Sequence, residues 1–398
     1  MLTRLKVQNY KSLENVEISL KPLTVFVGPN NAGKSNILDC LRFLKELGEL
    51  GAPAVNSRGG FRYLVWGGDL KRTISVEIEQ RVPIDSRGGV TYQVEISGGP
   101  TAYSVVREVL QEFWIMSDRG AIPEWVAKKL RDQPGVPRTK VSRDLLRFPV
   151  SERMAAVYEA QGMVKRKVDP LRLSLFQVPE PEIVYSLAQD IRKWTFYNFV
   201  PSRMRLPNPA RRELRVGTEG ENVSAVLHSL HSEYSENFKE IEEALKAGIP
   251  EIRRVLTPLT EQGETYISLE ESGLSISIPT WAMSDGTLQI LAQLAVISST
   301  EFPTLACFEE PEGRIHPRLL ELVLDVLKSA SKRTQILMTT HSPYLLDFLG
   351  SPENLIVVEK VGGKTQCKPV QDQEGVKEAL KTLGLGELWY SGHIGGTP

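Results

Sequence analysis

The chain begins with short stretches whose apolar positions recur with the period of strands and then of a helix. Residues 2–20, LTRLKVQNYKSLENVEISL, alternate apolar and polar positions as two strands do, with a turn at 9–12. Residues 23–27, LTVFV, have no polar face, which is typical of a strand covered on both sides. Residues 35–47 then place leucines and an isoleucine at helical spacing. A strand, a glycine-containing loop and a helix are therefore predicted in immediate succession.

The rest of the chain predicts an α/β fold with an insertion. Residues 72–82 and 90–97 resemble two antiparallel strands, whereas 103–116 and 182–194 look helical. From about residue 216 onward, helices and strands alternate, which favours a largely parallel sheet covered on both faces. The predicted helices are 221–230, 236–248, 288–298 and 317–330, and the predicted strands are 265–272, 274–280, 304–308 and 334–340. We therefore expect three parts: an N-terminal lobe (1–100), a helical and basic insertion (101–195), and a C-terminal lobe (196–398).

Composition places the chain among globular proteins of a reducing compartment. Of the 398 residues, 41% are hydrophobic and 24% charged, which is ordinary for a soluble globular protein. The three cysteines form no CxxC pair, so neither a zinc site nor a disulfide framework is indicated. No apolar stretch is long enough to cross a bilayer, and the N-terminus lacks the pattern of a signal peptide. We expect a cytoplasmic protein without a membrane segment.

The net charge of −1 conceals a segregation of charge. Residues 128–172 hold twelve Lys or Arg against five acids, and the arginines from Arg203 to Arg215 outnumber the single acid Glu213 by four. Such a basic region predicts contact with a polyanion such as DNA. Solvated helix faces would explain the same pattern without any ligand.

The strongest motif is GPNNAGKS at residues 28–35, which fits G-x-x-x-x-G-K-[ST] between the predicted strand and helix. In this pattern Gly28 and Gly33 allow the backbone N–H groups to turn inward around phosphate oxygens. Lys34 supplies a point charge to the β- and γ-phosphates, and the Ser35 hydroxyl can ligate Mg²⁺.

Carboxylates follow the predicted strand 304–308, where like charges would be costly without a cation or a reacting group to use them. We expect Glu309 to hold hydrated Mg²⁺ and Glu310 to orient or deprotonate the attacking water. Glu312 and His316 could be solvated loop positions or lie at a subunit contact. His341, at the tip of another predicted strand, is expected to contact the γ-phosphate or the water.

Ser284 and Gly286 precede a long apolar helix, so Ser284 is a plausible N-cap. A capped helix start is also an anion site, and the structural and functional interpretations are compatible.

Together these motifs resemble those of ABC-type ATPases in the branch that contains SMC proteins, RecF and the OLD-family ATPases, often labelled AAA family ATPases. The resemblance covers roughly 1–100 and 195–398. Its motifs are LKVQNYKSL, GPNNAGKSN, FVPS, SDGT, FEEPEGRIHP and TTHSP.

The resemblance implies a Walker A motif for the nucleotide, a Walker B acid at Glu309, a catalytic base at Glu310 and a switch histidine at His341. The signature motif, Ser284, Asp285, Gly286 and Thr287, would close over ATP held by a second protomer, which implies a head-to-tail homodimer around two ATP molecules. Family members often place a basic residue such as Lys11 near the α-phosphate. The residues expected to bind nucleotide are Gly28, Pro29, Asn30, Asn31, Ala32, Gly33, Lys34, Ser35, Asn36, Lys11, Ser284, Asp285 and Gly286, with Ser35 and Glu309 as Mg²⁺ ligands.

Several features depart from the family pattern. The signature reads SDGT rather than the SGGQ of transporters, Glu309 stands where Asp is common, and no Q-loop glutamine is evident between residues 50 and 100. The insertion is too short for an SMC coiled coil. Because no Asp-x-Asp follows His341, we expect the ATPase part alone, without the TOPRIM nuclease domain of OLD proteins.

Four functions remain open. The first is an ATPase that couples nucleotide state to a DNA-related task, such as phage defence or repair, with a separate effector. The second is a nucleotide-gated switch or scaffold for a protein partner, without nucleic-acid binding. A transporter ATPase is the third, and the fourth is a nuclease that uses Glu309, Glu310 and Glu312 as metal ligands.

Overall fold

The computed structural model describes residues 1–81, 88–100, 102–115, 139–142, 145–152, 171–177, 182–372 and 375–396. The chain divides into two compact units, and each unit draws on distant parts of the sequence. The first comprises Met1–Lys21, Asn36–Arg192 and Lys360–Cys367, and the second comprises Pro22–Ser35, Lys193–Glu359 and Lys368–Pro398. None of the helices in the described ranges combines the length and apolar character needed to cross a bilayer.

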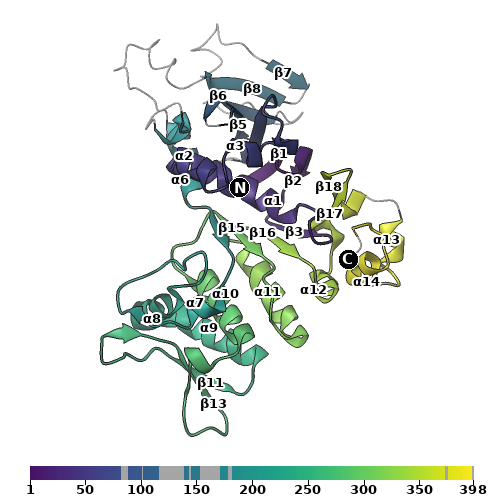
Figure 1. Ribbon diagram of the computed structural model, residues 1–398. Coiled ribbons are helices and arrows are strands. Elements are labelled where there is room, and N and C mark those ends of the chain that lie inside the picture. Colours follow the sequence, from purple (N-terminus) through teal and green to yellow (C-terminus); the bar gives the residue numbers. More distant parts are fainter. Residues whose placement is uncertain are drawn as a thin grey trace. The chain divides into compact units, whose positions relative to one another are not determined.

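The first unit is built on a seven-stranded antiparallel sheet with the order β2-β1-β4-β5-β6-β8-β7 (Figure 1). Its strands are β1 (Leu2–Tyr10), β2 (Leu13–Ser19), β4 (Ile74–Arg81), β5 (Gly88–Gly98), β6 (Tyr103–Ile115), β7 (Thr139–Ser142) and β8 (Leu145–Glu152). Its helices are α1 (Lys34–Glu49), α2 (Ala52–Asn56), α3 (Phe61–Leu64) and α6 (Glu182–Arg192). The predicted pairs β1–β2 and β4–β5 are confirmed by their antiparallel registers.

The helix predicted for 103–116 is wrong, because Tyr103–Ile115 forms β6 between β5 and β8. The register with β5 shifts where Val105 pairs with Ile96 and Arg107 pairs with Glu95, so that Val106 is an extra residue. This bulge breaks the alternation of apolar positions and leaves Val106 45% exposed. The predicted helix at 182–194 is confirmed as α6. Most of the residues between these two elements lie outside the described ranges.

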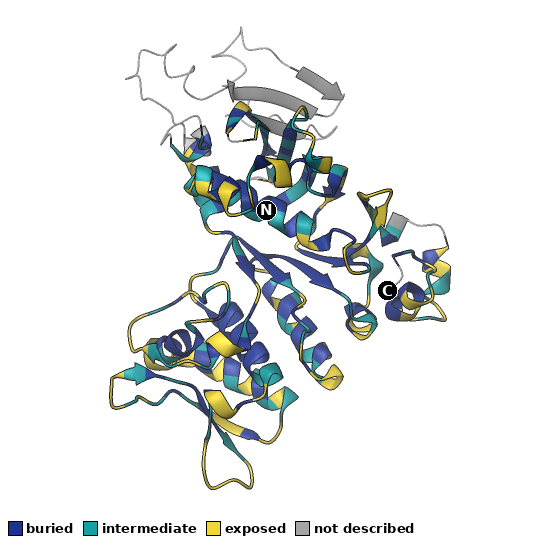
Figure 2. Ribbon diagram, in the orientation of Figure 1, coloured by how far each residue is buried: buried dark blue, intermediate teal, exposed yellow. Residues whose placement is uncertain are grey.

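The second unit contains the predicted parallel sheet. Its order is β18-β17-β3-β16-β15-β9, and every pair from β17 to β9 is parallel. The strands of this sheet are β3 (Leu23–Val27), β9 (Thr195–Tyr197), β15 (Leu305–Glu309), β16 (Gln335–Thr340), β17 (Leu355–Val361) and β18 (Lys364–Pro369). Residues 360–367, which include most of β18, are counted with the first unit. All of β3 and β16 is buried, as Figure 2 shows in dark blue, which confirms strands covered on both faces.

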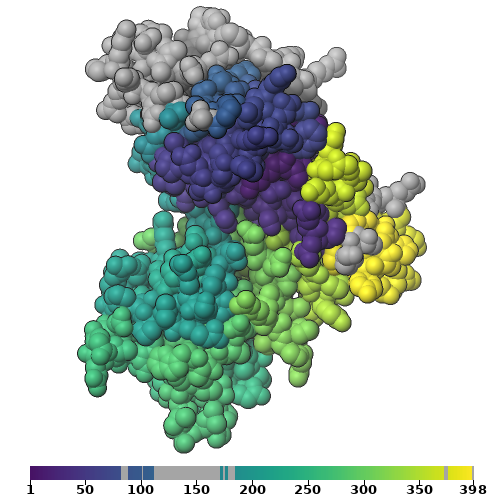
Figure 3. All heavy atoms as spheres, viewed as in Figure 1, coloured from purple at the N-terminus to yellow at the C-terminus, as the bar shows by residue number. Residues whose placement is uncertain are grey.

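Helices cover this sheet, and the second unit also contains a two-stranded and a three-stranded sheet of short strands. The helices are α7 (Pro201–Met204), α8 (Val223–Glu233), α9 (Ser235–Gly248), α10 (Asp285–Ser298), α11 (Leu320–Ala330), α12 (Pro343–Leu349), α13 (Val376–Ala379) and α14 (Leu385–Tyr390). The remaining strands are β10 (Asn208–Pro209), β11 (Ile252–Leu256), β12 (Glu264–Thr265), β13 (Ser268–Glu271) and β14 (Ile278–Pro279). Residues 288–298 of α10 are all buried, so this helix forms the centre of the unit. Figure 3 shows the elements from α8 to α10, teal to green, as one continuous mass.

Candidate active site

The phosphate-loop sequence lies between β3 and α1, as predicted. Lys34 is 4% exposed, and its Nζ donates hydrogen bonds to the carbonyl oxygens of Gly28 (2.8 Å) and Pro29 (3.0 Å). These bonds fold the loop around its own lysine. Burial lowers the pKa of Lys34 to about 8, although the carboxylates of Glu310 and Glu312 act in the opposite direction.

The two motif glycines are required for different reasons. Gly33 has φ 110°, a conformation that L side chains rarely adopt, as the sequence predicts for a residue that turns the loop inward. Gly28 has no such φ; instead, a Cβ at this position would lie 2.0 Å from the carbonyl oxygen of Val358 in β17. Gly28 is therefore needed because the neighbouring strand approaches closely. Asn31 also has positive φ, at 63°.

The parallel register brings three strand ends to one edge of the sheet. Thr340 at the end of β16 pairs with Val27 at the end of β3, and Thr339 pairs with Glu309 at the end of β15. The phosphate loop, His341 and Glu310 follow directly after these three strands. The edge that holds the loop therefore also holds the predicted acid, base and histidine.

Glu310 makes a sharp turn immediately after β15. Its φ is 46°, and its amide N–H donates to the Thr339 carbonyl oxygen and hydroxyl, both at 3.2 Å. The turn directs its side chain toward His341, whose Nε2 lies 3.3 Å from Oε1 of Glu310. Glu309, still within β15, and Glu310 therefore differ in backbone conformation.

His341 lies in a setting that favours the neutral imidazole. Burial lowers its pKa, the charge of Lys34 lowers it further, and Glu310 acts in the opposite direction. A neutral ring that contacts a carboxylate carries the proton on the contacting nitrogen. His341 can thus donate a hydrogen bond from Nε2 to Glu310 at neutral pH.

Glu312 is not a solvated loop position. Its Oε1 accepts a hydrogen bond from the Thr340 hydroxyl (2.5 Å) and another from the His341 amide (3.0 Å). Burial raises its pKa. His316, by contrast, is exposed, and its Nδ1 accepts from the Arg318 amide at the start of a short 3₁₀ helix. The sequence did not reveal these hydrogen bonds of Glu312, for which the only signal was a third acid close behind the strand.

Ser284 is the N-cap of α10, as predicted, and its Oγ accepts from the Thr287 amide at 3.1 Å. Asp285 forms ion pairs with Arg205 (2.6 Å) and Arg314 (3.2 Å). Gly286 approaches the Arg314 backbone so closely that a Cβ would lie 2.7 Å from its carbonyl oxygen. The start of α10 is thereby fixed against the loop that follows β15.

A buried glutamine of α10 makes a second contact with the loop after β15. Gln293 is 1% exposed, and its Nε2 donates to the Pro311 carbonyl oxygen at 2.6 Å. The helix that begins at the signature motif is thus bonded to the turn that carries Glu310.

Lys11 and Asn36 belong to the first unit and have partners there. Lys11 Nζ lies 2.6 Å from the Asp39 carboxylate, which also binds Arg58 at 2.8 Å. These cations lower the pKa of Asp39 to about 2 despite its burial. The side-chain amide of Asn36 donates to the Ser12 hydroxyl at 2.7 Å.

The arginines from 203 to 215 are neutralised in space, although they form a basic run in sequence. Each forms an ion pair: Arg203 with Glu219, Arg205 with Asp285, Arg211 with Glu213, Arg212 with Glu233, and Arg215 with Glu301. The local excess of four positive charges is therefore offset mainly by acids from other segments. Most of the predicted basic insertion 128–172 lies outside the described residues.

The donor set at the sheet edge suits Mg²⁺ bound together with a nucleotide. Ser35 offers a hydroxyl beside the loop and Glu309 a carboxylate at the end of β15, and Mg²⁺ is typically held by one or two such oxygens plus substrate phosphates. Within the described ranges, no three His, Cys, Asp or Glu side chains are grouped to hold a metal by themselves. This finding does not support a three-glutamate nuclease site.

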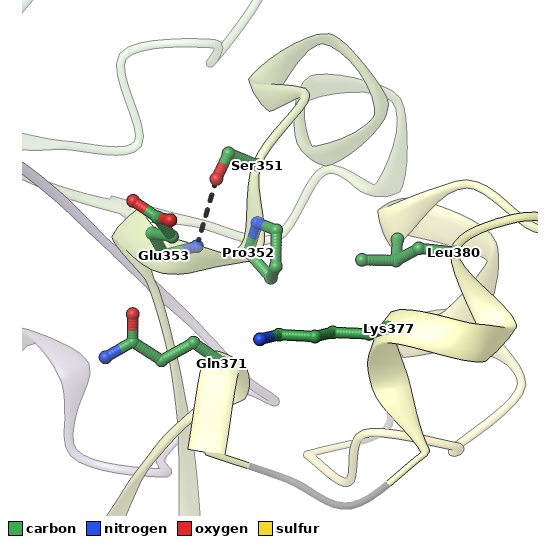
Figure 4. A pocket seen from close by; sticks show the side chains of 6 residues that line it. All are labelled: Ser351, Pro352, Glu353, Gln371, Lys377 and Leu380. Carbon is green, nitrogen blue, oxygen red and sulfur yellow. Dashed lines mark hydrogen bonds between the residues drawn. The ribbon is translucent and has the colours of Figure 1, made fainter.

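A pocket of about 370 Å³ lies elsewhere in the second unit (Figure 4). It is lined by Ser351, Pro352, Glu353, Gln371, Lys377 and Leu380. None of these residues belongs to the phosphate loop or to the strand-end acids. The candidate site is thus defined by the sheet edge and not by this pocket.

Comparison with known proteins assigns most of the chain to one family. Residues 23–347 match the family described as "AAA domain, putative AbiEii toxin, Type IV TA system". A stretch of 38 residues is 55% identical to the OLD nuclease of Thermus scotoductus and covers 10% of this chain and 7% of that protein. Another of 117 residues is 30% identical to the chromosome partition protein Smc of Methanococcus voltae and covers 27% of this chain and 10% of that protein. The matches thus span a tenth or less of these two relatives.

The solved structures add a match in fold. An SMC head bound to the C-winged helix domain of ScpA superposes with a TM-score of 0.56 at 15% identity, over 92% of this chain and 97% of that one. This likeness shows that the polypeptide folds as SMC-type ATPase heads do. The predicted fold class is thereby confirmed.

Proposed function

The chain belongs to this AAA-domain family and is an ABC-type ATPase of the SMC- and OLD-like kind, and on that premise we propose that it binds ATP with Mg²⁺ and hydrolyses ATP to ADP and phosphate. The observation that carries this proposal is the alignment of the phosphate loop, Glu310 and His341 along one edge of the parallel sheet. A nucleotide-binding loop, a candidate base and a hydrogen-bond donor thus follow three neighbouring strands.

In the proposed reaction, each residue at the sheet edge has a separate role. Lys34 would exchange its bonds to the loop carbonyls for the β- and γ-phosphates and provide a positive charge there. Glu310 would accept the proton of the attacking water, while neutral His341 would hold the Glu310 carboxylate in position through Nε2. Ser35 and Glu309 would hold Mg²⁺, which when bound neutralises charge on the phosphate oxygens. Asn31 and Gly33 would direct backbone N–H groups at those oxygens.

We propose further that two protomers associate head to tail around two ATP molecules. Ser284 caps α10 and is exposed, so this helix start is accessible to a phosphate from outside the chain, although the Ser284 hydroxyl also accepts from the Thr287 amide. Asp285 and Gly286 are fixed by Arg314, and this fixation would present the helix start in one conformation.

Two substitutions test the reaction and the shared site. Glu310→Gln should retain ATP binding, lower the hydrolysis rate by about 10²–10⁴-fold and accumulate ATP-bound dimer. Ser284→Arg should prevent closure of the dimer while each monomer still binds nucleotide. Ser351→Arg is the matched control, because Ser351 also caps a helix start but lines the pocket that contains no residue of the phosphate loop, the strand-end acids or the signature motif. Wild-type hydrolysis by Ser284→Arg would contradict the two-chain site.

The DNA-related part of the proposal now rests mainly on residues 128–172, because the arginines at 203–215 are paired. The family description names a putative toxin, and the OLD protein is named a nuclease, which supports a role in phage defence or repair. A separate effector and a cytoplasmic location are further parts of this proposal. Binding to duplex and single-stranded DNA should weaken steeply with salt, because bound phosphates release counterions. The absence of any binding at low salt would remove this part while leaving the ATPase intact.

A nucleotide-gated switch for a protein partner is the second candidate. The SMC head of similar fold was solved with a winged-helix domain of ScpA, which supports a protein ligand for such heads. Capture of a partner that depends on ATP and resists nuclease treatment would favour this function over DNA binding.

A further inference from the structure

Glu312 connects two neighbouring strand ends. It follows β15 by three residues, whereas its hydrogen-bond donors, Thr340 and the His341 amide, are at the end of β16. The Thr340 hydroxyl also accepts from the Ser342 amide at 3.0 Å. One carboxylate and one hydroxyl thus bond successive residues of the turn that carries the histidine.

The surroundings of Glu312 make an ionised carboxylate energetically unfavourable, because they are largely shielded from water. Thr340 is fully buried, and Oε2 of Glu312 is buried and accepts no hydrogen bond within the described part of the chain. The raised pKa of Glu312 reflects this burial and the neighbouring charge of Glu310. Burying a carboxylate with incomplete hydrogen bonding costs free energy, so stability alone does not explain Glu312 at this position.

The geometry that depends on Glu312 is the contact between His341 and Glu310. The imidazole meets Glu310 at 3.3 Å, and the backbone of His341 is held by Glu312. Glu310 itself is held by Thr339, the residue before Thr340. The candidate base and the histidine are therefore fixed through adjacent residues of β16, and only the histidine side uses Glu312.

We propose that Glu312 is a positioning residue that holds His341 against Glu310 and the terminal phosphate of ATP. This inference rests on the proposed ATPase function and assigns that site a further residue. Glu312 contacts neither nucleotide nor water in this scheme. It acts through the Thr340 hydroxyl and the His341 amide alone.

The test separates turnover from binding. Glu312→Ala should lower kcat by about 10- to 100-fold, because a small misplacement of a reacting group has effects of this size, while the affinity for ATP changes little. Glu312→Gln keeps an oxygen that can accept both hydrogen bonds and should recover most of the rate. Glu301→Ala, which removes a surface partner of Arg215, is the matched control and should behave as wild type.

A double-mutant cycle distinguishes positioning from general stabilisation. In a His341→Ala background, Glu312→Ala should cause little further loss of kcat, because its target is gone. If the two losses multiply, or if Glu312→Gln is no better than Glu312→Ala, the inference is overturned. If Glu312→Ala does not fold, Thr340→Val can replace it, because this variant removes one of the two hydrogen-bond donors to Glu312 at nearly constant size. Thr340→Val should also lower kcat, and an unchanged kcat would overturn the inference.

The outcomes also separate this inference from the proposed function. If the wild type and Lys34→Ala hydrolyse ATP equally, the ATPase proposal fails. If Lys34→Ala is inactive and Glu312→Ala matches the wild type, only the role of Glu312 fails.

Discussion

Replacement of Gly28 by alanine should destabilise the second unit because of a single close approach. A Cβ on Gly28 would lie 2.0 Å from the Val358 carbonyl oxygen, whereas real Cβ contacts under 3.0 Å are essentially never seen. The two backbones would have to separate by about 1 Å or more. Val357 pairs with Val27 in the parallel ladder, so this separation would strain the β3–β17 pairing beside the phosphate loop.

The expected cost follows from these contacts. Overpacking contributes about 1–3 kcal/mol, and a weakened ladder hydrogen bond adds about 0.5–1.5 kcal/mol. The free energy of unfolding should therefore fall by about 2–4 kcal/mol, which corresponds to a decrease in Tm of roughly 5–10 °C for a unit of this size. ATP affinity should fall as well, because the Gly28 carbonyl oxygen belongs to the loop that Lys34 closes.

Thermal unfolding of Gly28→Ala beside Gly99→Ala provides the assay. Gly99 has an ordinary φ, and a Cβ there would meet nothing within 4 Å, so its alanine variant controls for the chemical change alone. If both variants melt within about 1 °C of each other, steric conflict with Val358 does not explain the glycine, and the reasoning from close approach is refuted.

Three further predictions concern ionisable and polar groups. Asp39→Asn should lower the free energy of unfolding by about 2 kcal/mol at pH 7, because the pKa of Asp39 is lowered from 3.8 to about 2 in the folded protein. In the wild type, the stabilisation by ionised Asp39 is present above pH 4 and is lost as pH falls toward 2. Acid unfolding of the variant should not show this loss. Because the pKa of Lys34 is lowered to about 8, the nucleotide-free protein should gain stability as pH rises from 8 toward 10.5, while its affinity for ATP declines. Lys34→Arg should abolish both trends, as measured by thermal unfolding and by ATP-binding titrations across this pH range. If either trend persists in the variant, Lys34 is not the group that titrates. Gln293→Leu leaves the Pro311 carbonyl oxygen without its donor and should lower Tm by several degrees; an unchanged Tm would show that this bond contributes nothing net.

The errors of sequence interpretation have identifiable causes. In β6 the apolar residues Val106, Val109, Leu110 and Phe113 are spaced as on a helix, but the bulge at Val106 produces this spacing within a strand. Pairing with β5 and β8 outweighs the local pattern, because each pair supplies a full ladder of hydrogen bonds. The charge balance of the 203–215 segment could not be read from its sequence either, since acids such as Glu219, Glu233 and Glu301, which pair with its arginines, come from elsewhere in the chain.

The sequence by itself determined the features that depend on neighbouring residues. The loop at 28–35, the apolar strand before it, the N-cap Ser284 and the acids after β15 can all be predicted, because their geometry is set within one strand, turn or helix start. The order of strands and helices was enough to predict the parallel sheet, and therefore the shared edge at which their carboxyl ends meet.

Only the tertiary structure decided which distant groups meet at that edge. The hydrogen bond from the His341 amide to Glu312 joins residues 29 apart, and the close approach of Val358 to Gly28 joins β17 to the loop after β3. Periodicity and motif spacing predict which face of a helix or strand a residue occupies. They do not predict which residue it contacts there, because strand register and close packing determine those contacts. For this reason the nucleotide loop could be recognised in the sequence, whereas the reason for Gly28 and the role of Glu312 could not.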